Sequence, residues 1–584
     1  MQPQLQDGFV SLLKGANYSV DPNILPDTQY SRGLNVTSRG GIVSTRPAFS
    51  KVYDMYSSGS WQGCAVYRLN GADRLVFVVS GIIKSMVLST GVVSTHATFA
   101  TTDFDTAYLR QVDKYFVVQN GIDEPIIIDM DIASPNVVDQ SGLDEQYRFR
   151  RGTVMAYGRG RAYVAVDRVW DTVTSTWVED IGIRQFVFGD LIKANAISDV
   201  IKFEQDTIIN EGGAIMLQNE LGFIGGMEFL RNASTGTGIG SLIVFGRDGC
   251  SGYDVGLIYD GTTVTDNTVG QVLFTGTGTG TKSPMSVIAV NNDIAYRGTD
   301  GLRTMSYTGT ALTGNTGSLS CLPMSTEIQY ALDMDEDDDL KYVSATFVDN
   351  RMMFTTGGRE DGSFRCLGVM DMASVSALGQ GSGAMWDGIW TGLNFMSVAK
   401  GYINGKEVPL IVHNNDGAYE LYTLANDAIT TDTSRLYTKG YTFTLADVAG
   451  IFDAKEFLGI ELWIKNVIGD VSITAYYKAD GYELWNKCTT IEIKADSTGL
   501  SQNRYRILLT PDKAACNLSN ERLVTTGTSF QFCLQWTGTM KIIEARFGAD
   551  PNSSEISYCH GTETVTKLEP TDDQILLDDF IKEI

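Results

Sequence analysis

The chain has 584 residues, a formal net charge of −25, and 43% hydrophobic against 20% charged residues. This hydrophobic content is typical of a globular protein and excludes an intrinsically disordered chain. The acidic balance disfavours a protein that reads nucleic acid through a basic face, and it suits a channel wall along which DNA slides without sticking. Many viral and secreted proteins are simply acidic, so the charge alone leaves both explanations open.

The first fifty residues are predicted to form an extended, turn-rich arm, because they contain several Pro and Gly residues and no helical apolar stripe. Such a segment, residues 1–50, cannot build a core alone and must pair with sheets of this chain or with a neighbouring subunit. We expect residues 40–43 to close the following domain by pairing near residues 419–422. Residues 1–30 would then be free to reach a partner, with Arg46 and Pro47 as candidate partner contacts.

Short apolar strands joined by tight turns follow from about residue 61, and turns such as Asn70-Gly71, Ser80-Gly81 and Asp416-Gly417 favour hairpins. The expected strands include 64–69, 74–79, 82–88, 107–112, 114–118, 125–129, 153–157, 161–165, 241–245, 286–290, 293–296, 343–347, 351–354, 409–413 and 418–422. A single meander of this size is marginal in water, and stacking such units around an axis buries both faces of each.

A repeat of roughly 40–50 residues predicts a β-propeller of ~6–8 blades over residues 51–425. The longer gap near residues 168–240 is predicted to be an insertion. A series of β-sandwiches is the alternative, and the regular strand–turn–strand spacing favours the propeller.

From about residue 431, strict alternation of apolar and polar residues predicts a C-terminal β-sandwich over residues 431–560. Runs such as Ile460–Lys465 and Val471–Tyr477 carry this pattern. An acidic tail, residues 561–584, follows and is expected to include a short helix from Asp573 to Ile584. The fold class is therefore all-β.

No motif in the sequence points to catalysis. The Gly/Thr-rich run before Lys282 and Ser283 fails as a phosphate loop, because Thr281 separates the last Gly from Lys282 and Pro284 follows. The chain has 8 Cys and 3 His without metal-ligand spacing, so we expect buried free thiols and no zinc. We therefore predict no catalytic residue, no cofactor and no enzyme activity.

The densest charge run is residues 333–339, in which Asp333, Asp335 and Asp337 are candidate Ca²⁺ ligands. The position of Asp338, where an EF-hand loop requires Gly, argues against that loop. A solvated acidic loop is the favoured interpretation.

Several phrases, in order along the chain, resemble proteins of short-tailed bacteriophages known as tail nozzle, tail tubular protein B or packaged-DNA stabilisation proteins. In the arm, a Lys-Gly turn precedes Pro22-Asn23-Ile24-Leu25-Pro26, and Asn35-Val36 runs through a Gly-Gly-Ile hairpin into Arg46-Pro47. Further phrases are Tyr115–Ile127, Met155–Val164 and Val471–Trp485.

This resemblance implies a structural protein of the virion tail, assembled in the host cytoplasm as a hexameric ring below the portal and its adaptor. Such a ring retains packaged DNA, conducts it during ejection, and docks tail fibres or tail spikes. The acidic charge would keep the DNA off the lumen wall. The N-terminus lacks signal-peptide features, and no run of about 18 apolar residues predicts a membrane span.

Two other function classes stay open at this point. One is a host-surface carbohydrate-binding or depolymerising tail protein that uses the propeller as a platform. The other is a cellular propeller scaffold, although the repeats lack the Gly-His signature and the regularly recurring Trp-Asp pair of WD repeats.

Overall fold

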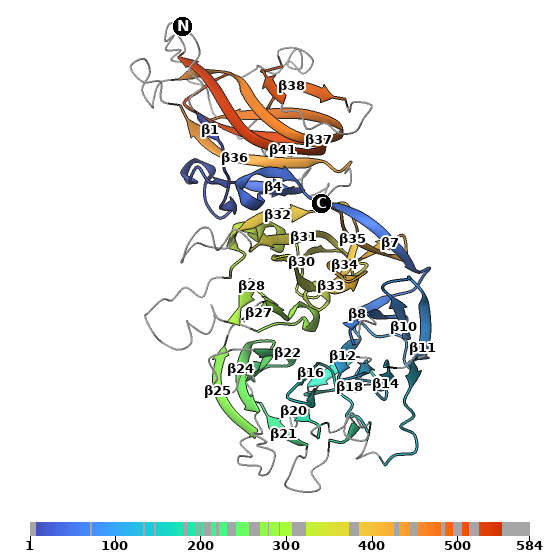
Figure 1. Cartoon of the computed structure of the whole chain (residues 1–584). Helices are drawn as coiled ribbons and strands as arrows, with labels where there is room; N and C mark the ends of the chain where they lie inside the picture. Colours follow the sequence, from blue (N-terminus) through green and yellow to red (C-terminus); the bar gives the residue numbers. More distant parts are fainter. Residues whose placement is uncertain are drawn as a thin grey trace.

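The computed structural model describes most of the chain as two β-rich bodies joined by the N-terminal arm (Figure 1). The described residues are 7–69, 73–131, 135–144, 148–171, 173–174, 176–179, 184–190, 192, 197, 201–203, 212–217, 221–230, 241–255, 269–277, 280–290, 293–305, 323–372, 385–425, 431–443, 454–480, 485–494, 505–512 and 525–551. The expected turn at residues 70–71 and the acidic tail, 561–584, lie outside them.

Small antiparallel sheets of three or four strands repeat along the first and larger body. The sheets are numbered in chain order, and the strands of each are given from the innermost outward. The first three sheets are: first, β8 (Trp61–Tyr67), β9 (Arg74–Val79), β10 (Ile82–Val87) and β11 (Val93–Thr98); second, β12 (Tyr108–Val112), β13 (Tyr115–Gln119), β14 (Ile126–Asp129) and β15 (Asn136–Val137); third, β16 (Met155–Gly158), β17 (Arg161–Val166), β20 (Gln185–Phe188) and β21 (Gly213–Met216). The other four are: fourth, β22 (Ile224–Leu230), β23 (Ser241–Gly246), β24 (Gly249–Val255) and β25 (Val269–Thr277); fifth, β26 (Ile288–Val290), β27 (Asp293–Gly298) and β28 (Gly301–Thr304); sixth, β29 (Ala345–Val348), β30 (Arg351–Gly358), β31 (Phe364–Asp371) and β32 (Trp386–Trp390); seventh, β33 (Phe395–Ile403), β34 (Lys406–Asn415), β35 (Ala418–Ala425) and β7 (Ala48–Tyr56).

The innermost strands of these sheets contact one another in a closed cycle. In chain order each of β8, β12, β16, β22, β26, β29 and β33 packs against the next, and β33 returns to β8. The sheets therefore stand around one axis as the blades of a β-propeller, with seven blades in the described residues (Figure 1). The prediction of an all-β propeller is confirmed.

The ring is closed by β7, not by residues 40–43. The register of β7 against β35 runs antiparallel from Tyr56 opposite Tyr419 to Ala48 opposite Ala425. Gly40 and Gly41 have φ values of 71° and 82° and form a turn, and Val43 beyond them pairs with Ile542 of the second body. The expected closing partner on β35 was right, but the closing strand lies further along the chain.

The predicted insertion at residues 168–240 contains strands of two blades. Strands β20 and β21 complete the third blade, since β20 pairs with both β17 and β21, and β22 begins the fourth. Only the hairpin of β18 (Arg168–Asp171) and β19 (Thr176–Glu179) stands outside the blade sheets in the described part of this region. The weaker alternation of these strands concealed them in the sequence.

Tight turns hold the hairpins in the predicted places. Ser80 and Gly81 have φ values of 48° and 74°, and Arg159 and Gly160 have 52° and 70°. Two consecutive positive φ values give the turn twist that matches the right-handed twist of paired strands. Short helical turns lie elsewhere: η1 (Pro22–Ile24), η2 (Arg39–Gly41), η5 (Pro284–Ser286), η6 (Thr326–Ile328), α3 (Gln329–Leu332) and η7 (Asp339–Tyr342).

The C-terminal sandwich is built around two long antiparallel strands that bend together. Its strands are β36 (Ser434–Thr442), β37 (Lys455–Ala479), β38 (Asn486–Ile493), β39 (Tyr505–Leu509), β40 (Thr526–Gly527) and β41 (Ser529–Pro551). Strands β37 and β41 pair from end to end, with register shifts between residues 465 and 472. Asn466, Gly469 and Gly538 have positive φ at this bend.

The two halves of each long strand face one another across the core. Phe532 and Phe547, both on β41, stack with ring centroids 4.0 Å apart and an interplanar angle of 10°. Phe457 and Tyr477, both on β37, lie 4.5 Å apart. Large aromatic side chains in offset or tilted contact dominate such cores, so the bend folds the β37–β41 strand pair into two packed layers.

The N-terminal arm lies within this architecture and contributes six short strands. They are β1 (Asp7–Phe9), β2 (Gly15–Ala16), β3 (Gln29–Tyr30), β4 (Arg32–Leu34), β5 (Val36–Thr37) and β6 (Val43–Thr45). Strand β1 pairs with β41, and Phe9, Leu12 and Tyr30 are buried in one hydrophobic core that the sandwich shares with the fifth and sixth blades. The expectation that residues 1–30 are free is therefore wrong for residues 7–30, because their apolar side chains complete that core.

The described cysteines are buried free thiols, as the sequence predicts: Cys64, Cys250, Cys366, Cys488 and Cys533. Burial raises the pKa of Cys64, Cys488 and Cys533 to about 12, so these thiols stay protonated at neutral pH. Among the described residues, no helix is long and apolar enough to cross a membrane.

The ion pair across the closing strand gives a pH-dependent prediction. Lys51 Nζ on β7 donates to Glu420 on β35 at 2.6 Å, and this bond holds the pKa of Glu420 below its usual range. A lowered carboxyl pKa stabilises the fold above about pH 4, and that contribution is lost as the pH falls through the folded-state pKa. We expect Glu420→Gln to lower the melting temperature at neutral pH and to match the wild type at about pH 3.

Thermal melts at both pH values check this expectation. Glu407→Gln is the matched control. The Lys400–Glu407 pair lies within the β33–β34 hairpin of the same blade and does not connect the two ends of the propeller ring. A Glu420→Gln deficit that is equal at both pH values would contradict the assigned role of the ion pair.

Candidate functional site

The arm, the propeller and the sandwich meet at Arg46, which is 2% exposed. Its guanidinium donates to Asn35 Oδ1, to the carbonyl of Pro47 and to the carbonyl of Thr391, each at 2.8 Å, and it forms an ion pair with Asp432. The guanidinium carbon also lies 3.9 Å from the centre of the Phe49 ring. These contacts satisfy most of the five guanidinium N–H groups inside the protein.

Asn35 completes this junction from the arm side. Its side-chain amide donates to Thr391 Oγ1 at 2.9 Å and to the Thr433 carbonyl at 3.0 Å, while its Oδ1 also accepts from the Thr391 amide. Its φ of 54° lies in the left-handed region, which Asn tolerates better than most residues. Thr391 follows the sixth blade and residues 432–433 precede β36, so this Asn35–Arg46 knot joins all three parts of the chain.

The knot changes the prediction for Arg46 and Pro47 as partner contacts. Burial lowers the pKa of Arg46 to about 10, against the opposing effect of Asp432. The side chain is enclosed by groups of its own chain, and the carbonyl of Pro47 is one of its acceptors. The structure therefore places both residues in the internal junction.

Thr45, beside the knot, holds the bend of β41. Its hydroxyl accepts from Trp536 Nε1 at 2.9 Å and from the Met540 amide at 3.2 Å, and it donates to the Gly538 carbonyl at 3.0 Å. The bend opens the strand ladder at these positions, and buried backbone groups need partners. A single arm hydroxyl supplies them.

A second junction fixes the arm to the sixth blade. Arg39 contacts Asp371 at 2.5 Å and Asp349 at 2.7 Å, and the Ser38 amide donates to Asp387 at 2.9 Å. The Tyr30 hydroxyl lies 3.1 Å from the Asp387 carbonyl. Burial raises the pKa of the fully enclosed Asp387 carboxyl. Sequence reasoning missed this cluster, because its acids and bases are more than 300 residues apart.

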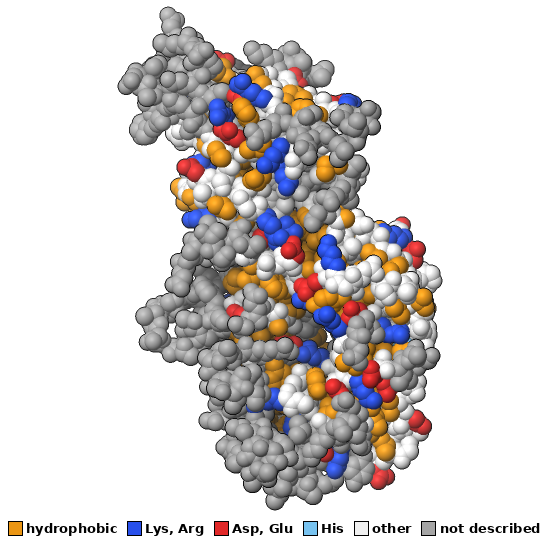
Figure 2. Space-filling view, viewed as in Figure 1, with side chains coloured by type: hydrophobic (Ala, Val, Ile, Leu, Met, Phe, Trp, Pro, Cys, Tyr) orange, Lys and Arg blue, Asp and Glu red, His pale blue; other side chains and the backbone are white. Residues whose placement is uncertain are grey.

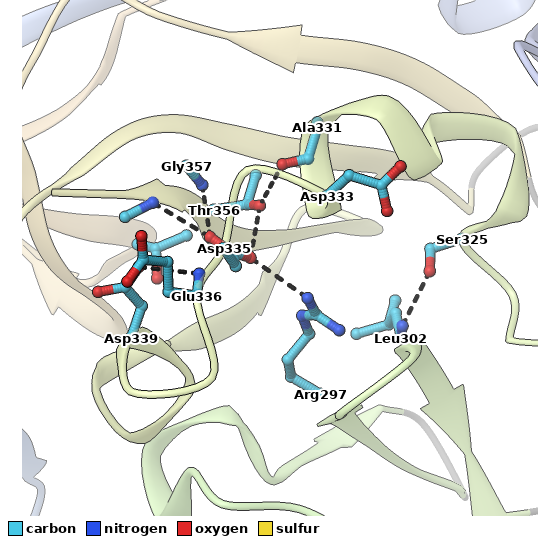
Figure 3. A network of polar contacts seen from close by, with 12 residues as sticks. Arg297, Leu302, Ser325, Ala331, Asp333, Asp335, Glu336, Asp339, Thr356 and Gly357 are labelled. Carbon is cyan, nitrogen blue, oxygen red and sulfur yellow. Dashed lines mark hydrogen bonds and ion pairs between the residues drawn. The ribbon is translucent and has the colours of Figure 1, made fainter.

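The acidic run 333–339 is divided by the structure into separate roles (Figure 3). Asp335 is completely buried and receives hydrogen bonds from Thr356 at 2.8 Å and from the amides of Gly357 and Gly358 at 2.7 and 3.1 Å. Arg297, from the fifth blade, lies 3.2 Å away. Asp335 therefore ties the fifth blade to the sixth.

The other two Ca²⁺ candidates turn away from Asp335. Asp333 accepts from Gln329, and Asp337 pairs with Lys282. Figure 3 shows the Asp333 side chain pointing away from the Asp335 carboxyl. Across the described residues no group of three His, Cys, Asp or Glu side chains could hold a metal ion, so Asp333, Asp335 and Asp337 do not form the candidate site.

The axis of the propeller is largely filled by side chains. A cavity of about 340 Å³ lies between the innermost strands of all seven blades, lined by residues such as Cys64, Met155, Met227 and Phe347. The Arg110 guanidinium and the Glu228 carboxylate pair across it at 2.9 Å. This volume is that of a small-molecule pocket, far too small for a DNA duplex.

Comparison with known proteins gives little beyond the fold. No protein-family model and no curated protein matches the chain. Among solved structures, a chain of a mitotic checkpoint complex crystal structure is 12% identical, with a TM-score of 0.35 over 65% of this chain and 95% of that one. The β-propeller domain of Cps50 (Swd1) from Myceliophteria thermophila is 10% identical, with a TM-score of 0.35 over 65% of this chain and all of that one. The propeller assignment rests on the strand pairing of this chain itself.

The contacts of Thr45 give a mutational prediction. We expect Thr45→Val to lower the free energy of unfolding by about 2–4 kcal/mol, because Trp536 Nε1 and the Met540 amide lose a buried acceptor. Denaturant titration measures this loss. Thr474→Val is the control, since its hydroxyl pairs with Thr490 at the surface of the same sandwich. Equal losses in the two variants would show that the arm hydroxyl does not hold the bend.

Proposed function

We propose that this chain is a structural protein of a short-tailed bacteriophage virion and forms the tail nozzle below the portal and adaptor. The observation that carries this proposal is the arm, in which the resembling phrases are densest and which is hydrogen-bonded to both bodies. Strands β2 and β4 pair with β32 of the propeller, whereas β1 and β6 pair with β41 of the sandwich. A wall that guides DNA during ejection needs such rigidly joined domains.

The remaining resembling phrases lie on hairpins of the two bodies. Tyr115–Ile127 spans β13 and the start of β14, and Met155–Val164 spans the β16–β17 hairpin. Val471–Trp485 covers the last part of β37 and extends to Trp485, which directly precedes β38. These positions agree with the propeller that the resemblance implies, so the phrases support the same proposal as the arm.

In this proposal the DNA conduit is the space enclosed by several copies, since the cavity of about 340 Å³ on the propeller axis of one copy is too small for a duplex. A hexameric ring is the implied assembly, with adaptor proteins on one side and tail fibres or spikes on the other. Acidic and basic side chains are interspersed on the face shown in Figure 2, so this face does not supply the acidic lumen of the proposal. The net charge of −25 would keep passing DNA from adhering. The proposal assigns no catalytic step to the chain.

Assembly of the purified full chain tests this proposal. Native mass spectrometry and negative-stain imaging, with and without a purified adaptor protein, are expected to show a closed ring with an open centre. Retention of duplex DNA on the ring is expected to be undetectable even at low salt, where phosphate contacts are strongest. A chain that stays monomeric with the adaptor, or a ring that binds duplex DNA tightly, would contradict the nozzle function.

A further inference from the structure

A groove of about 600 Å³ opens between the arm and the sandwich, far from the propeller axis. Arm residues 18–23 form one rim, and the ends of β36, β37 and β41 form the opposite wall. Its size falls within the range of small-ligand sites, roughly 300–1,000 Å³. The proposed function assigns no role to this groove.

The rim is held in place by local hydrogen bonds. The Asp21 carboxylate accepts from the Asn23 amide at 2.8 Å, and the Asn17 side chain accepts from the Ser19 amide and hydroxyl at 3.1 and 2.7 Å. Strand β4 lies against β36, with Arg32 opposite Tyr437 in the register. The groove is therefore shaped before any ligand arrives.

Arg32 is the distinctive group in this groove. Its guanidinium carbon lies 4.1 Å from the centre of the Tyr18 ring and 5.8 Å from that of Tyr330. The Arg32 charge also acts on the Tyr437 hydroxyl, and among the described residues no carboxylate lies at ion-pair distance from the guanidinium. Stacking on a ring leaves the in-plane N–H groups available for a planar two-oxygen acceptor.

The two carboxylates that line the groove are already engaged. Asp21 caps the turn described above, and Asp480 accepts from the Thr528 amide at 2.6 Å and the Ser529 amide at 2.9 Å. Lys478 lies 6.0 Å from the Trp485 ring centre and adds a second positive charge to the lining. Of the four charged groups in the lining, Arg32 presents N–H donors whose planar geometry favours a carboxylate.

The rest of the lining suits a sugar ring better than a peptide side chain. Trp485 and Tyr437 meet edge to face at 5.8 Å, and together with Tyr18 they give the groove aromatic walls. The polar residues Ser19, Ser31, Asn23, Ser529 and Gln531 also line the groove. Aromatic surface and convergent polar groups together match a ligand with apolar C–H faces and many hydroxyls.

We propose that this groove binds an acidic saccharide, with the sugar carboxylate on the Arg32 guanidinium and the sugar ring against the aromatic wall. The inference goes beyond the nozzle function and does not rest on it. The binding would attach the arm–sandwich end of the molecule to an acidic polysaccharide, such as one on a cell surface.

Isothermal titration of the purified full chain tests the proposal with oligogalacturonate and hyaluronan oligosaccharides. Maltohexaose is the neutral sugar control, and polyglutamate is an acidic peptide control. We expect at least one acidic saccharide to bind, Arg32→Gln to weaken it by about tenfold or more, and Trp485→Leu to weaken it as well. Arg32→Lys keeps the charge without the planar fork and is expected to restore binding only in part.

Arg150→Gln is the matched charge control, because Arg150 is exposed on the propeller. Melting temperatures close to that of the wild type confirm that the variants are folded. The proposal is overturned if no acidic saccharide binds at millimolar concentration, if polyglutamate binds as tightly, or if Arg32→Gln leaves the affinity unchanged. Because the titration uses the isolated chain, its failure is distinguishable from failure to form a ring.

Discussion

The structure depends on the burial of one guanidinium. Removing a charged Arg side chain from water is costly unless its N–H groups find acceptors and its charge finds a partner. Arg46 finds them only where the arm, the end of the sixth blade and the segment before β36 come together: at Asn35, Thr391 and Asp432. Each part would leave buried polar groups unsatisfied if it moved away. The knot therefore helps to fix the position of the propeller relative to the sandwich, beside the hydrophobic core that the two share.

The neighbouring arm residues extend this constraint in both directions. Thr45 supplies hydrogen bonds to the bend of β41, and the strand that follows the knot, β7, closes the propeller on β35. On the other side, Arg39 and Tyr30 hold the arm against the sixth blade. One continuous stretch of chain thus completes the sandwich, joins the two bodies and closes the ring. In the nozzle that we propose, neighbouring domains must transmit force without separating, and this arrangement suits that role. The groove beside Arg32 is not part of these junctions.

Much of the fold was predictable from the sequence, because alternation and turn chemistry are local signals. Hairpins such as Arg74–Val79 with Ile82–Val87 follow directly from their apolar strands and the Ser80-Gly81 turn. Strands β20 to β22 were missed because their alternation is weak, and the arm was misjudged because nothing local shows that Phe9 and Leu12 belong to a core some 500 residues away. The roles of the charged clusters could not be predicted for the same reason. Asp335 lies in an acidic run, yet its ion pair with Arg297 makes it a buried link between two blades. The sequence shows Asn35 and Arg46 beside turn residues, but it does not show that Arg46 forms an ion pair with Asp432.

The central claim is that the Asn35–Arg46 knot makes the propeller and the sandwich one cooperative body. Differential scanning calorimetry of the full chain with Arg46→Lys tests this most directly, because Lys keeps the charge but cannot reach the same acceptors. The account predicts a single transition for the wild type and two separated transitions, the first at lower temperature, for the variant. Arg506→Lys, an ion-paired residue at the sandwich surface, should keep the single transition. An Arg46→Lys profile that matches the wild type would contradict the account.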